Sequence, residues 1–327
     1  MDSDKTVIKT SFGDEFVYAQ ILLLSFVSAY FLTKIHKPRK FLSAFIGALI
    51  IFGTSGTQIL HSFTPCVLTF LSFKLANFNK NVKLTVFLSV FGYLYFFRTC
   101  HLYFPNVFDQ ATPFANAVQL ISSLRLVSLG FDYNADSICG FSDIVAYTYC
   151  FIGLFTGPFY RKCVFDDYCN NEVLDKIPVR NAVLNKLKLL PPTFIFYLAL
   201  KLWFPLDYFR SEDFLSSNWI ICCIFIQVPF AWVRYRFYSA WMAAESVGIV
   251  SRLGAYKSSR QPRSGLGPKC GESEPGQEND EYSFAVIENI DMVACEFDPS
   301  IRTSMRKWNT SVQWWLANYI YRVFEIK

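Results

Sequence analysis

A stripe of polar residues in an aromatic segment near the end of the sequence is its strongest candidate for a chemical site. On helical spacing, Arg306, Asn309 and Gln313 share one face at i, i+3 and i+7. The broad apolar face of the same segment consists of Trp308, Val312, Trp315 and Tyr319. Such a stripe suits a site where charge develops between packed helices. A helix lying at a membrane surface, with Trp at the headgroup level, would show the same pattern, so spacing leaves both interpretations open.

Ionisable residues inside apolar runs are further candidates, because a charge at membrane depth usually has a function. They are Arg98, Arg125, Arg234, Arg236 and Glu245. The arginines have a simpler explanation where they lie near segment ends, since a guanidinium there reaches the headgroups or stacks on aromatic rings. Glu245 lies in the middle of an apolar run and needs a buried partner, for which Arg125 or Arg236 is a candidate.

No pattern in the sequence predicts an activated nucleophile or a metal site. The usual base near neutral pH is His, and the three present, His36, His61 and His101, belong to no recognisable catalytic motif. The ten Cys show neither a CxxC pair nor zinc-ligand spacing. We therefore predict no bound metal or cofactor. From the residues alone, the chain is a membrane protein with a lined cavity.

The composition favours a membrane protein over a soluble one. The 327 residues would allow two soluble domains, but 53% of them are apolar and only 17% are charged, whereas soluble domains carry about 25% charged residues. Disorder and a coiled coil are excluded by the same counts, which include 35 Phe. The net charge of +5 is too small to indicate a nucleic-acid partner.

Several apolar runs approach the length of about 18–20 residues that crosses a bilayer. They cover residues 16–33, 41–73, 84–104, 110–131, 144–160, 189–200, 214–233 and 237–251. We expect 53–56 and Pro65 to break the second run, and Pro191 and Pro192 to make 189–200 short, broken or re-entrant. Interrupted helices at membrane depth must be buried in protein or line a wet cavity. The predicted fold is therefore an all-α, polytopic integral membrane protein with six to eight segments, a helical bundle with interrupted helices around a tunnel.

Charged residues between the runs predict the orientation and one loop. The basic turn 34–40 should face the cytosol, which places the N-terminus on the lumenal or external side. Residues 252–282 are hydrophilic, with a basic half followed by an acidic half, and are expected to form a flexible loop. Residues 1–327 as a whole are expected to form a single membrane-embedded region, with this loop inside it.

Four stretches of the chain carry a resemblance to a known family. They are TPFANAVQL at 112–120 with LRLVSL at 124–129, YTYCFIG at 147–153 with TGPF at 156–159, RYRFYSAWMAAE at 234–245 with GAY at 254–256, and IENID at 287–291 with MRKWNTSVQWWL at 305–316. In this order they resemble the membrane-bound O-acyltransferases, of the lysophosphatidylinositol acyltransferase type. The last stretch is the most specific.

The resemblance implies an acyl-CoA-dependent enzyme of the endoplasmic reticulum that acts in phospholipid remodelling. It would transfer a polyunsaturated, arachidonoyl-like acyl group from acyl-CoA to the sn-2 hydroxyl of lysophosphatidylinositol, with membrane lipids as further partners. The family fold surrounds a tunnel that acyl-CoA enters from the cytosolic side. Asn309 matches the family's catalytic Asn, while Arg306, Gln313, Trp308 and Glu245 are candidates for residues that support it or line the tunnel.

The sequence departs from the family pattern at the general base. In the family a membrane-buried His lies on a helix beyond the Trp-Asn motif, whereas 18 residues follow Asn309 here and none is His. We therefore expect an incomplete form of such an enzyme, truncated before that His, whose own activity is an open question. The alternatives are an inactive truncated product that binds lipid or a partner protein, and a family member that uses lysophosphatidylcholine or lysophosphatidylserine. A transporter is disfavoured, because no span carries a ladder of charges.

Overall fold

The computed structural model describes residues 2–35, 37–75, 81–134, 139–205, 207–268 and 281–321, with side chains from residue 13 onward except at 210 and 224. Within this part, six helical stretches are long and apolar enough to cross a membrane. They are Gly13–Leu32, Arg39–Lys74, Val82–Tyr103, Pro113–Phe131, Arg180–Trp203 and Trp219–Ser251. The predicted all-α, polytopic membrane fold is confirmed.

The helices follow one another along the chain with short connections. They are α1 (Asp2–Leu32), α2 (Arg39–Ser55), α3 (Ile59–Lys74), α4 (Val82–Tyr103), α5 (Pro113–Phe131), α6 (Phe141–Thr148), α7 (Lys162–Asn170), α8 (Arg180–Trp203), α9 (Glu212–Leu215), α10 (Trp219–Phe225), α11 (Gln227–Ser251), α12 (Met292–Phe297), α13 (Ile301–Arg306) and α14 (Thr310–Trp315), which continues into a π-helical turn, Leu316–Tyr321. The strands β1 (Tyr256–Lys257) and β2 (Tyr282–Ser283) form an antiparallel pair, with Tyr256 opposite Ser283.

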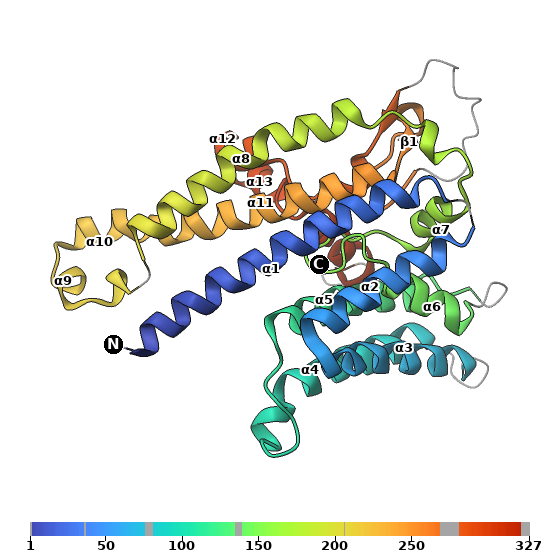
Figure 1. Cartoon of the computed structure of the whole chain (residues 1–327), viewed down its shortest axis with the longest axis horizontal. Helices are drawn as coiled ribbons and strands as arrows, with labels where there is room; N and C mark the ends of the chain where they lie inside the picture. The colour runs from blue at the N-terminus through green and yellow to red at the C-terminus, as the bar shows by residue number, and fades with distance from the viewer. Residues whose placement is uncertain are drawn as a thin grey trace.

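Two groups of helices make up the molecule. The long helices α1, α8 and α11 lie side by side, and α2 to α6 form a second group packed beneath them (Figure 1). Helix α5 is at the centre of the second group, since 14 of its 19 residues are buried. Helices α1 to α4, by contrast, leave large apolar side chains such as Leu23, Phe52 and Leu88 more than half exposed, as expected of surfaces that contact lipid.

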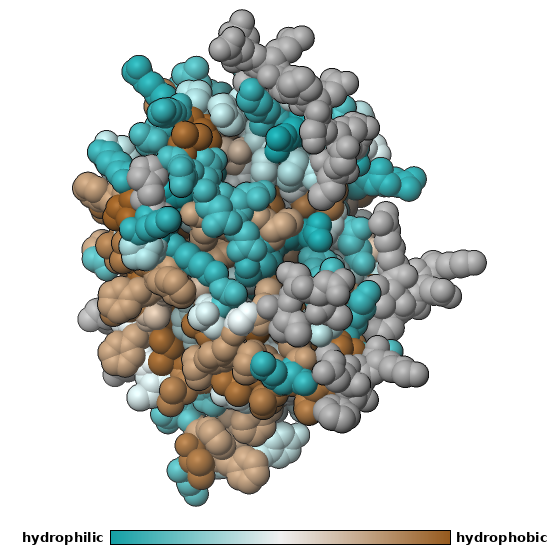
Figure 2. All heavy atoms as spheres, turned by 90° about the vertical axis from the view of Figure 1, so that its right-hand side faces the viewer, coloured by the Kyte–Doolittle hydropathy of each residue, from teal (hydrophilic) through white to brown (hydrophobic). Residues whose placement is uncertain are grey.

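One end of the molecule is markedly more polar than its flanks. The basic turn before α2, helix α7 and the β1–β2 pair all lie at this end, opposite the N-terminus (Figure 1). Hydrophilic side chains cover its upper and central parts, and apolar side chains gather in the lower part (Figure 2). If the basic turn faces the cytosol as predicted, this polar end is the cytosolic one.

The prolines interrupt the helices less than the sequence predicts. The break in 41–73 occurs at Gly56, whose φ of 55° is left-handed, and Pro65 lies inside α3. Pro191 and Pro192 lie inside the continuous helix α8, so the prediction of a broken or re-entrant segment there is wrong. Their missing N–H groups leave only the carbonyls of Leu187 and Lys188, in the polar first part of α8, without a helical donor.

The run 144–160 is not a spanning helix, although its composition allows one. Helix α6 ends at Thr148, and the chain then continues without regular structure through Gly153 and Gly157, both with positive φ. This segment is buried against α2, where a Cβ on Gly47 would lie 1.8 Å from the carbonyl oxygen of Tyr149. Irregular backbone at this depth needs donors for its carbonyl groups.

Arg125 supplies those donors. Its side chain is fully buried in α5, and Nη1 donates to the carbonyl oxygens of Tyr147, Thr148 and Cys150 at 3.0–3.1 Å, while Nη2 donates to that of Ile152 at 2.6 Å. The guanidinium also lies over the ring of Tyr160, 4.7 Å from its centroid. The charge at this position is therefore structural, because it caps the carboxyl end of α6 and the segment after it.

Arg39 has the same function at the polar end. Its Nε donates to the carbonyl oxygens of Leu32 and Ile35, and its Nη1 donates to those of Tyr168 and Asn171 at 2.8 Å. The side chain is buried although it belongs to the basic turn that was expected to face water. It fastens the connection between α1 and α2 to the end of α7.

Replacing Arg125 should destabilise the protein strongly. Arg125→Met leaves four buried carbonyl groups without their donor, and we expect a loss of at least about 3 kcal/mol in stability. The loss would be measured as a lower midpoint of thermal unfolding in detergent, followed by size-exclusion chromatography. Arg98→Met, which removes an exposed guanidinium, is the matched control. Equal midpoints for the two variants would contradict the structural role.

Candidate active site

Asn309 lies in a sharp turn between α13 and α14. Its φ of 49° and ψ of 51° are left-handed, a conformation that Asn tolerates better than most residues, and its carbonyl oxygen accepts the first helical hydrogen bond, from the N–H of Gln313 at 3.0 Å. The expected single helix over 305–321 is therefore wrong. Helix α13 ends at Arg306, and a new helix begins directly after the left-handed Asn309.

The turn, rather than a helical face, gathers the predicted polar residues. Arg306, Trp308, Asn309 and Gln313 line one open hollow of about 450 Å³. Its remaining lining residues are Arg302, Met305, Val312 and Leu316. The residues named from the sequence are thus brought together, although by a different geometry from the one that suggested them.

Gln313 holds the turn closed. Its side-chain amide donates to the carbonyl oxygens of both Met305 and Trp308, at the end of α13 and just after it. Asn309 differs from it, since its own amide has no hydrogen-bond partner among the residues that the structure describes. The Asn309 side chain is therefore available to a ligand in the hollow.

Trp308 packs away from the polar residues, against the aromatic face of α11. Its ring lies edge-to-face with Trp241 at 4.9 Å and with Tyr238 at 5.4 Å between centroids. The Tyr238 hydroxyl donates to Glu296 on α12 at 2.7 Å, and Arg234 forms an ion pair with the same carboxylate at 2.9 Å. Arg234 is thus engaged in joining α11 to α12.

A short segment before α12 supports the turn from behind. The carbonyl oxygen of Asn289 accepts the N–H of Thr310 at 2.9 Å, and its side-chain Oδ1 accepts the hydroxyl of Ser311 at 2.6 Å. Ile290 forms an isolated antiparallel bridge with Trp308. Residues 289–290 therefore hold residues on both sides of Asn309.

Glu245 anchors this supporting segment. Its side chain is 1% exposed, and Oε1 accepts the backbone N–H groups of Asn289 at 2.7 Å and Ile290 at 3.0 Å. Its Oε2 lies 2.7 Å from Nζ of Lys186 on α8. Glu245 does not line the hollow, and it reaches Asn309 only through 289–290.

The prediction that Arg125 or Arg236 pairs with Glu245 is therefore wrong, because its partner is Lys186. Arg125 binds carbonyl oxygens, and Nε of Arg236 lies 3.7 Å from Glu15 on α1. Lys186 was not predicted, because it lies in the amphipathic first turns of α8, where a Lys is ordinarily solvated. A separation of 59 residues between Lys186 and Glu245 leaves no local pattern that could have indicated the pair.

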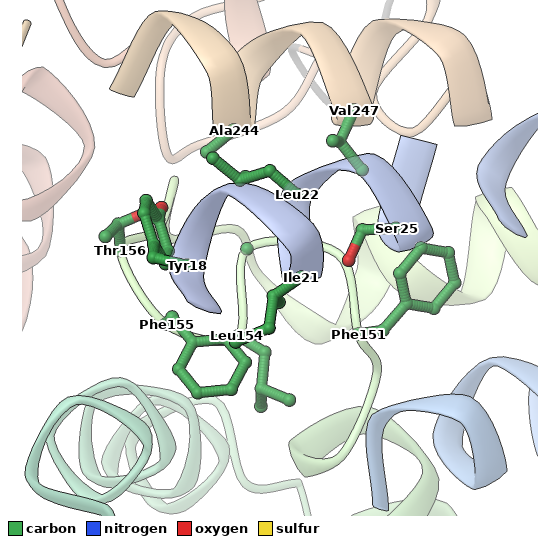
Figure 3. Close-up of a pocket in the computed structure, with 11 residues that line it drawn as sticks. Tyr18, Ile21, Leu22, Ser25, Phe151, Leu154, Phe155, Thr156, Ala244 and Val247 are labelled. Atoms are coloured by element: carbon green, nitrogen blue, oxygen red, sulfur yellow. The ribbon is translucent and has the colours of Figure 1, made fainter. Parts of the chain in front are cut away.

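A small cavity beside this site is enclosed by α1, α11 and the irregular segment (Figure 3). Tyr18 and Thr156 lie together at one side, with their hydroxyls 2.7 Å apart, and Trp241 donates its indole N–H to the carbonyl oxygen of Thr156 at 3.1 Å. The space of about 20 Å³ suffices for one water molecule. Thr156 thus connects the segment that Arg125 organises with the aromatic cluster around Trp308.

A larger polar pocket of about 430 Å³ lies at the polar end, between α7 and β1. Basic residues Arg252, Lys257 and Arg260 line it together with Tyr256, whose hydroxyl donates to Asp167 at 2.6 Å. Burial, followed by the nearby Asp167 carboxylate, raises the pKa of Tyr256 above its ordinary value, so the hydroxyl stays protonated. These contacts involve the first part of the predicted loop 252–282, while residues 269–280 lie outside the described residues.

The arrangement can bind and orient a polar group but supplies no evident base. Of the His residues, His61 contacts the Tyr93 hydroxyl through Nδ1 at 2.9 Å, His101 lies at the end of α4, and His36 lies outside the described residues. No described His lines the hollow around Asn309. The described residues also contain no group of three potential ligands that could hold a metal ion.

Removing the Glu245 carboxylate should loosen the Asn309 turn. Glu245→Ala leaves two buried N–H groups and the Lys186 ammonium without their acceptor, and we expect a loss of about 3–5 kcal/mol in stability. The double variant Glu245→Gln with Lys186→Met should recover most of that loss, because the Gln oxygen can still accept both N–H groups and no charge is left unpaired. Thermal unfolding in detergent tests both. A double variant no more stable than Glu245→Ala would argue against this arrangement.

Comparison with known proteins agrees with the architecture. A sequence model of MBOAT, the membrane-bound O-acyltransferase family, matches residues 17–327. The chain is 33% identical over 330 residues to membrane-bound acylglycerophosphatidylinositol O-acyltransferase mboat7 of Danio rerio, which covers 94% of this chain and 70% of that protein. It is 33% identical over 315 residues to the protein of that name from Xenopus laevis, covering 87% of this chain and 65% of the relative.

The human relative gives the same result at lower identity. Membrane-bound acylglycerophosphatidylinositol O-acyltransferase MBOAT7 of Homo sapiens is 30% identical over 338 residues, covering 94% of this chain and 70% of the relative. The chain thus spans about two thirds of the length of these relatives. On the family match and on the identity to these relatives, the chain belongs to the membrane-bound O-acyltransferase family.

Proposed function

We propose that this protein is an acyl-CoA-dependent lysophospholipid O-acyltransferase that acylates the sn-2 hydroxyl of lysophosphatidylinositol during phospholipid remodelling. Membership of the family and the names of its relatives support the reaction and the acceptor. The observation that carries the proposal is the free amide of Asn309 in an open hollow within a membrane protein. The endoplasmic reticulum as location and a polyunsaturated, arachidonoyl-like acyl group belong to the proposal.

The reaction needs a polar group that orients the acceptor. The sn-2 oxygen attacks the thioester carbonyl carbon, a C–O bond forms, the C–S bond breaks, and the hydroxyl proton passes through a base to the leaving thiolate of CoA. The Asn309 amide can accept the hydroxyl proton in a hydrogen bond or donate to the carbonyl oxygen as negative charge develops there. The resemblance assigns the base to a His, whose contribution in such reactions is typically 10²–10⁴-fold.

The other predicted residues fit supporting functions. Gln313 holds the end of α13, Trp308 fixes the turn against α11, and Glu245 anchors the segment behind it. Arg306 lines the hollow itself. In this proposal Asn309 touches the reacting atoms. Gln313, Trp308 and Glu245 keep its left-handed backbone in place.

The polar pocket between α7 and β1 supports the use of acyl-CoA. CoA carries several phosphate groups on a nucleotide, and Lys257, Arg260 and Arg252 provide positive charge around a pocket large enough for part of it. The pocket lies at the polar end, beside the basic turn that is predicted to face the cytosol. Acyl-CoA arriving from the cytosol would meet this pocket first.

Replacing Asn309 should abolish the reaction without unfolding the protein. Asn309→Gly is the sharper variant, because Gly keeps the left-handed backbone while removing the amide. We expect kcat to fall at least about 100-fold. The measurement is the formation of phosphatidylinositol from arachidonoyl-CoA and lysophosphatidylinositol, by membranes that lack endogenous activity and contain the expressed protein.

Asn318→Gly is the control for Asn309→Gly, since Asn318 lies on the same terminal segment and its amide only caps the carbonyl oxygen of Trp314. Normal activity of Asn309→Gly would exclude Asn309 from the chemistry. Wild-type activity on lysophosphatidylcholine or lysophosphatidylserine but not on lysophosphatidylinositol would assign a different acceptor. An inactive wild-type protein that still binds lysophospholipid would favour the non-catalytic alternative.

Removing positive charge from the polar pocket should weaken acyl-CoA binding. For Lys257→Ala combined with Arg260→Ala, we expect the KM for arachidonoyl-CoA to rise roughly three- to tenfold at low salt, because each partly solvated charge contributes modestly. The KM for lysophosphatidylinositol should not change. Lys176→Ala, an exposed Lys at the same end that does not line the pocket, is the control. An unchanged KM for arachidonoyl-CoA would move CoA binding elsewhere.

A further inference from the structure

We infer that Arg302 and Arg306 form a phosphate-binding pair that holds the lysophospholipid acceptor beside Asn309. The inference deepens the proposed function and rests on it. Both arginines belong to α13, one helical turn apart, and both line the hollow that contains Asn309. Two guanidinium groups on one rim are suited to a phosphodiester, because each presents paired donors to its oxygens.

Among the residues that the structure describes, no acid is paired with either guanidinium group. Of the nearby acids, Glu296 is paired with Arg234 at 2.9 Å, and Asp291 lies 3.7 Å from Lys307. Neither Arg302 nor Arg306 has an ion-pair or hydrogen-bond partner among the residues that the structure describes. Two positive charges are therefore left at this rim for an anionic ligand.

The hollow also has an apolar lining. Met305, Val312 and Leu316 line it, and Asn309 lies in the same hollow as both the apolar and the cationic residues. Helices α12 and α13 also carry Phe297 and Ile301, which are 79% and 83% exposed, so an apolar surface adjoins the hollow. An amphiphile from the membrane can place its acyl chain on the apolar residues and its phosphate on the arginines.

The covalent structure of the substrates favours the acceptor as the source of this phosphate. In a lysophospholipid, only two carbons and one oxygen separate the sn-2 hydroxyl from phosphorus, so a site that fixes the phosphate also positions the hydroxyl at Asn309. In acyl-CoA, the long pantetheine arm separates the thioester from every phosphate. A phosphate bound beside Asn309 therefore belongs to the acceptor, and the pocket at the polar end remains for CoA.

The kinetic test separates the two substrates. Arg302→Gln and Arg306→Gln should each raise the KM for lysophosphatidylinositol roughly tenfold, and the double variant more, because each removes charge-assisted hydrogen bonds. The kcat and the KM for arachidonoyl-CoA should stay within about twofold of wild type. Arg306→Lys should restore part of the affinity, since a Lys keeps the charge but not the paired donors.

Lys307→Gln is the matched control, because Lys307 is adjacent in sequence, is equally charged, faces Asp291 and does not line the hollow. A rise confined to the KM for arachidonoyl-CoA would assign the pair to CoA and overturn the inference. A fall in kcat with unchanged KM values would reduce the arginines to structural residues of the turn, which also overturns it.

A binding measurement keeps the inference separate from catalysis. The purified protein in nanodiscs of zwitterionic lipid should bind lysophosphatidylinositol at least tenfold more tightly than a monoacylglycerol with the same acyl chain, and the double Gln variant should lose this preference. Equal binding of both ligands by wild type would overturn the inference even if the enzyme is active. If wild type shows this preference but forms no product, the proposed function fails while the phosphate site stands.

Discussion

The constraint on which this structure depends is that backbone without regular hydrogen bonds cannot lie at membrane depth unless side chains satisfy it. The protein meets this constraint with single charged side chains. Arg125 donates to four carbonyl groups at the end of α6 and just after it, and Arg39 donates to two at the end of α1 and two at the end of α7. Glu245 does the converse, because its carboxylate accepts two N–H groups from the segment behind the Asn309 turn.

Two of these charges, Arg125 and Glu245, connect the fold to the candidate site. The segment that Arg125 organises contacts the site through two hydrogen bonds. The N–H of Phe159 donates to the Ser311 hydroxyl at 3.1 Å, and the Trp241 indole N–H donates to the Thr156 carbonyl oxygen. The segment that Glu245 organises reaches it through Asn289. The left-handed turn at Asn309 is therefore held from both sides by irregular segments, each fixed by one buried charge. Gln313 closes it from within.

The sequence predicts the class of protein and the residues of the hollow better than it predicts the helices. Long apolar runs and few charges are local properties of the sequence, so the membrane-spanning helices can be predicted from it. The end of α6 depends on the distant Arg125, the continuity of α8 across two prolines on packing against α11, and the turn after α13 on 289–290 behind it, so local patterns mislead at 144–160, 189–200 and 305–321. Arg306, Trp308, Asn309 and Gln313 meet because they are close in sequence, whereas Lys186 and Glu245 meet only through the packing of α8 on α11.

The buried charges also constrain how the chain enters the bilayer. Arg125 precedes its acceptors in the sequence, the carbonyls of 147–152. A charged side chain at the centre of an isolated inserted helix costs about 3 kcal/mol, and that cost is recovered only when the later segment arrives. Helix α5 thus leaves the ribosome carrying a charge whose acceptors have not yet been synthesised. Helix α5 therefore has to mature as a block with the 149–160 segment, rather than as a separate helix.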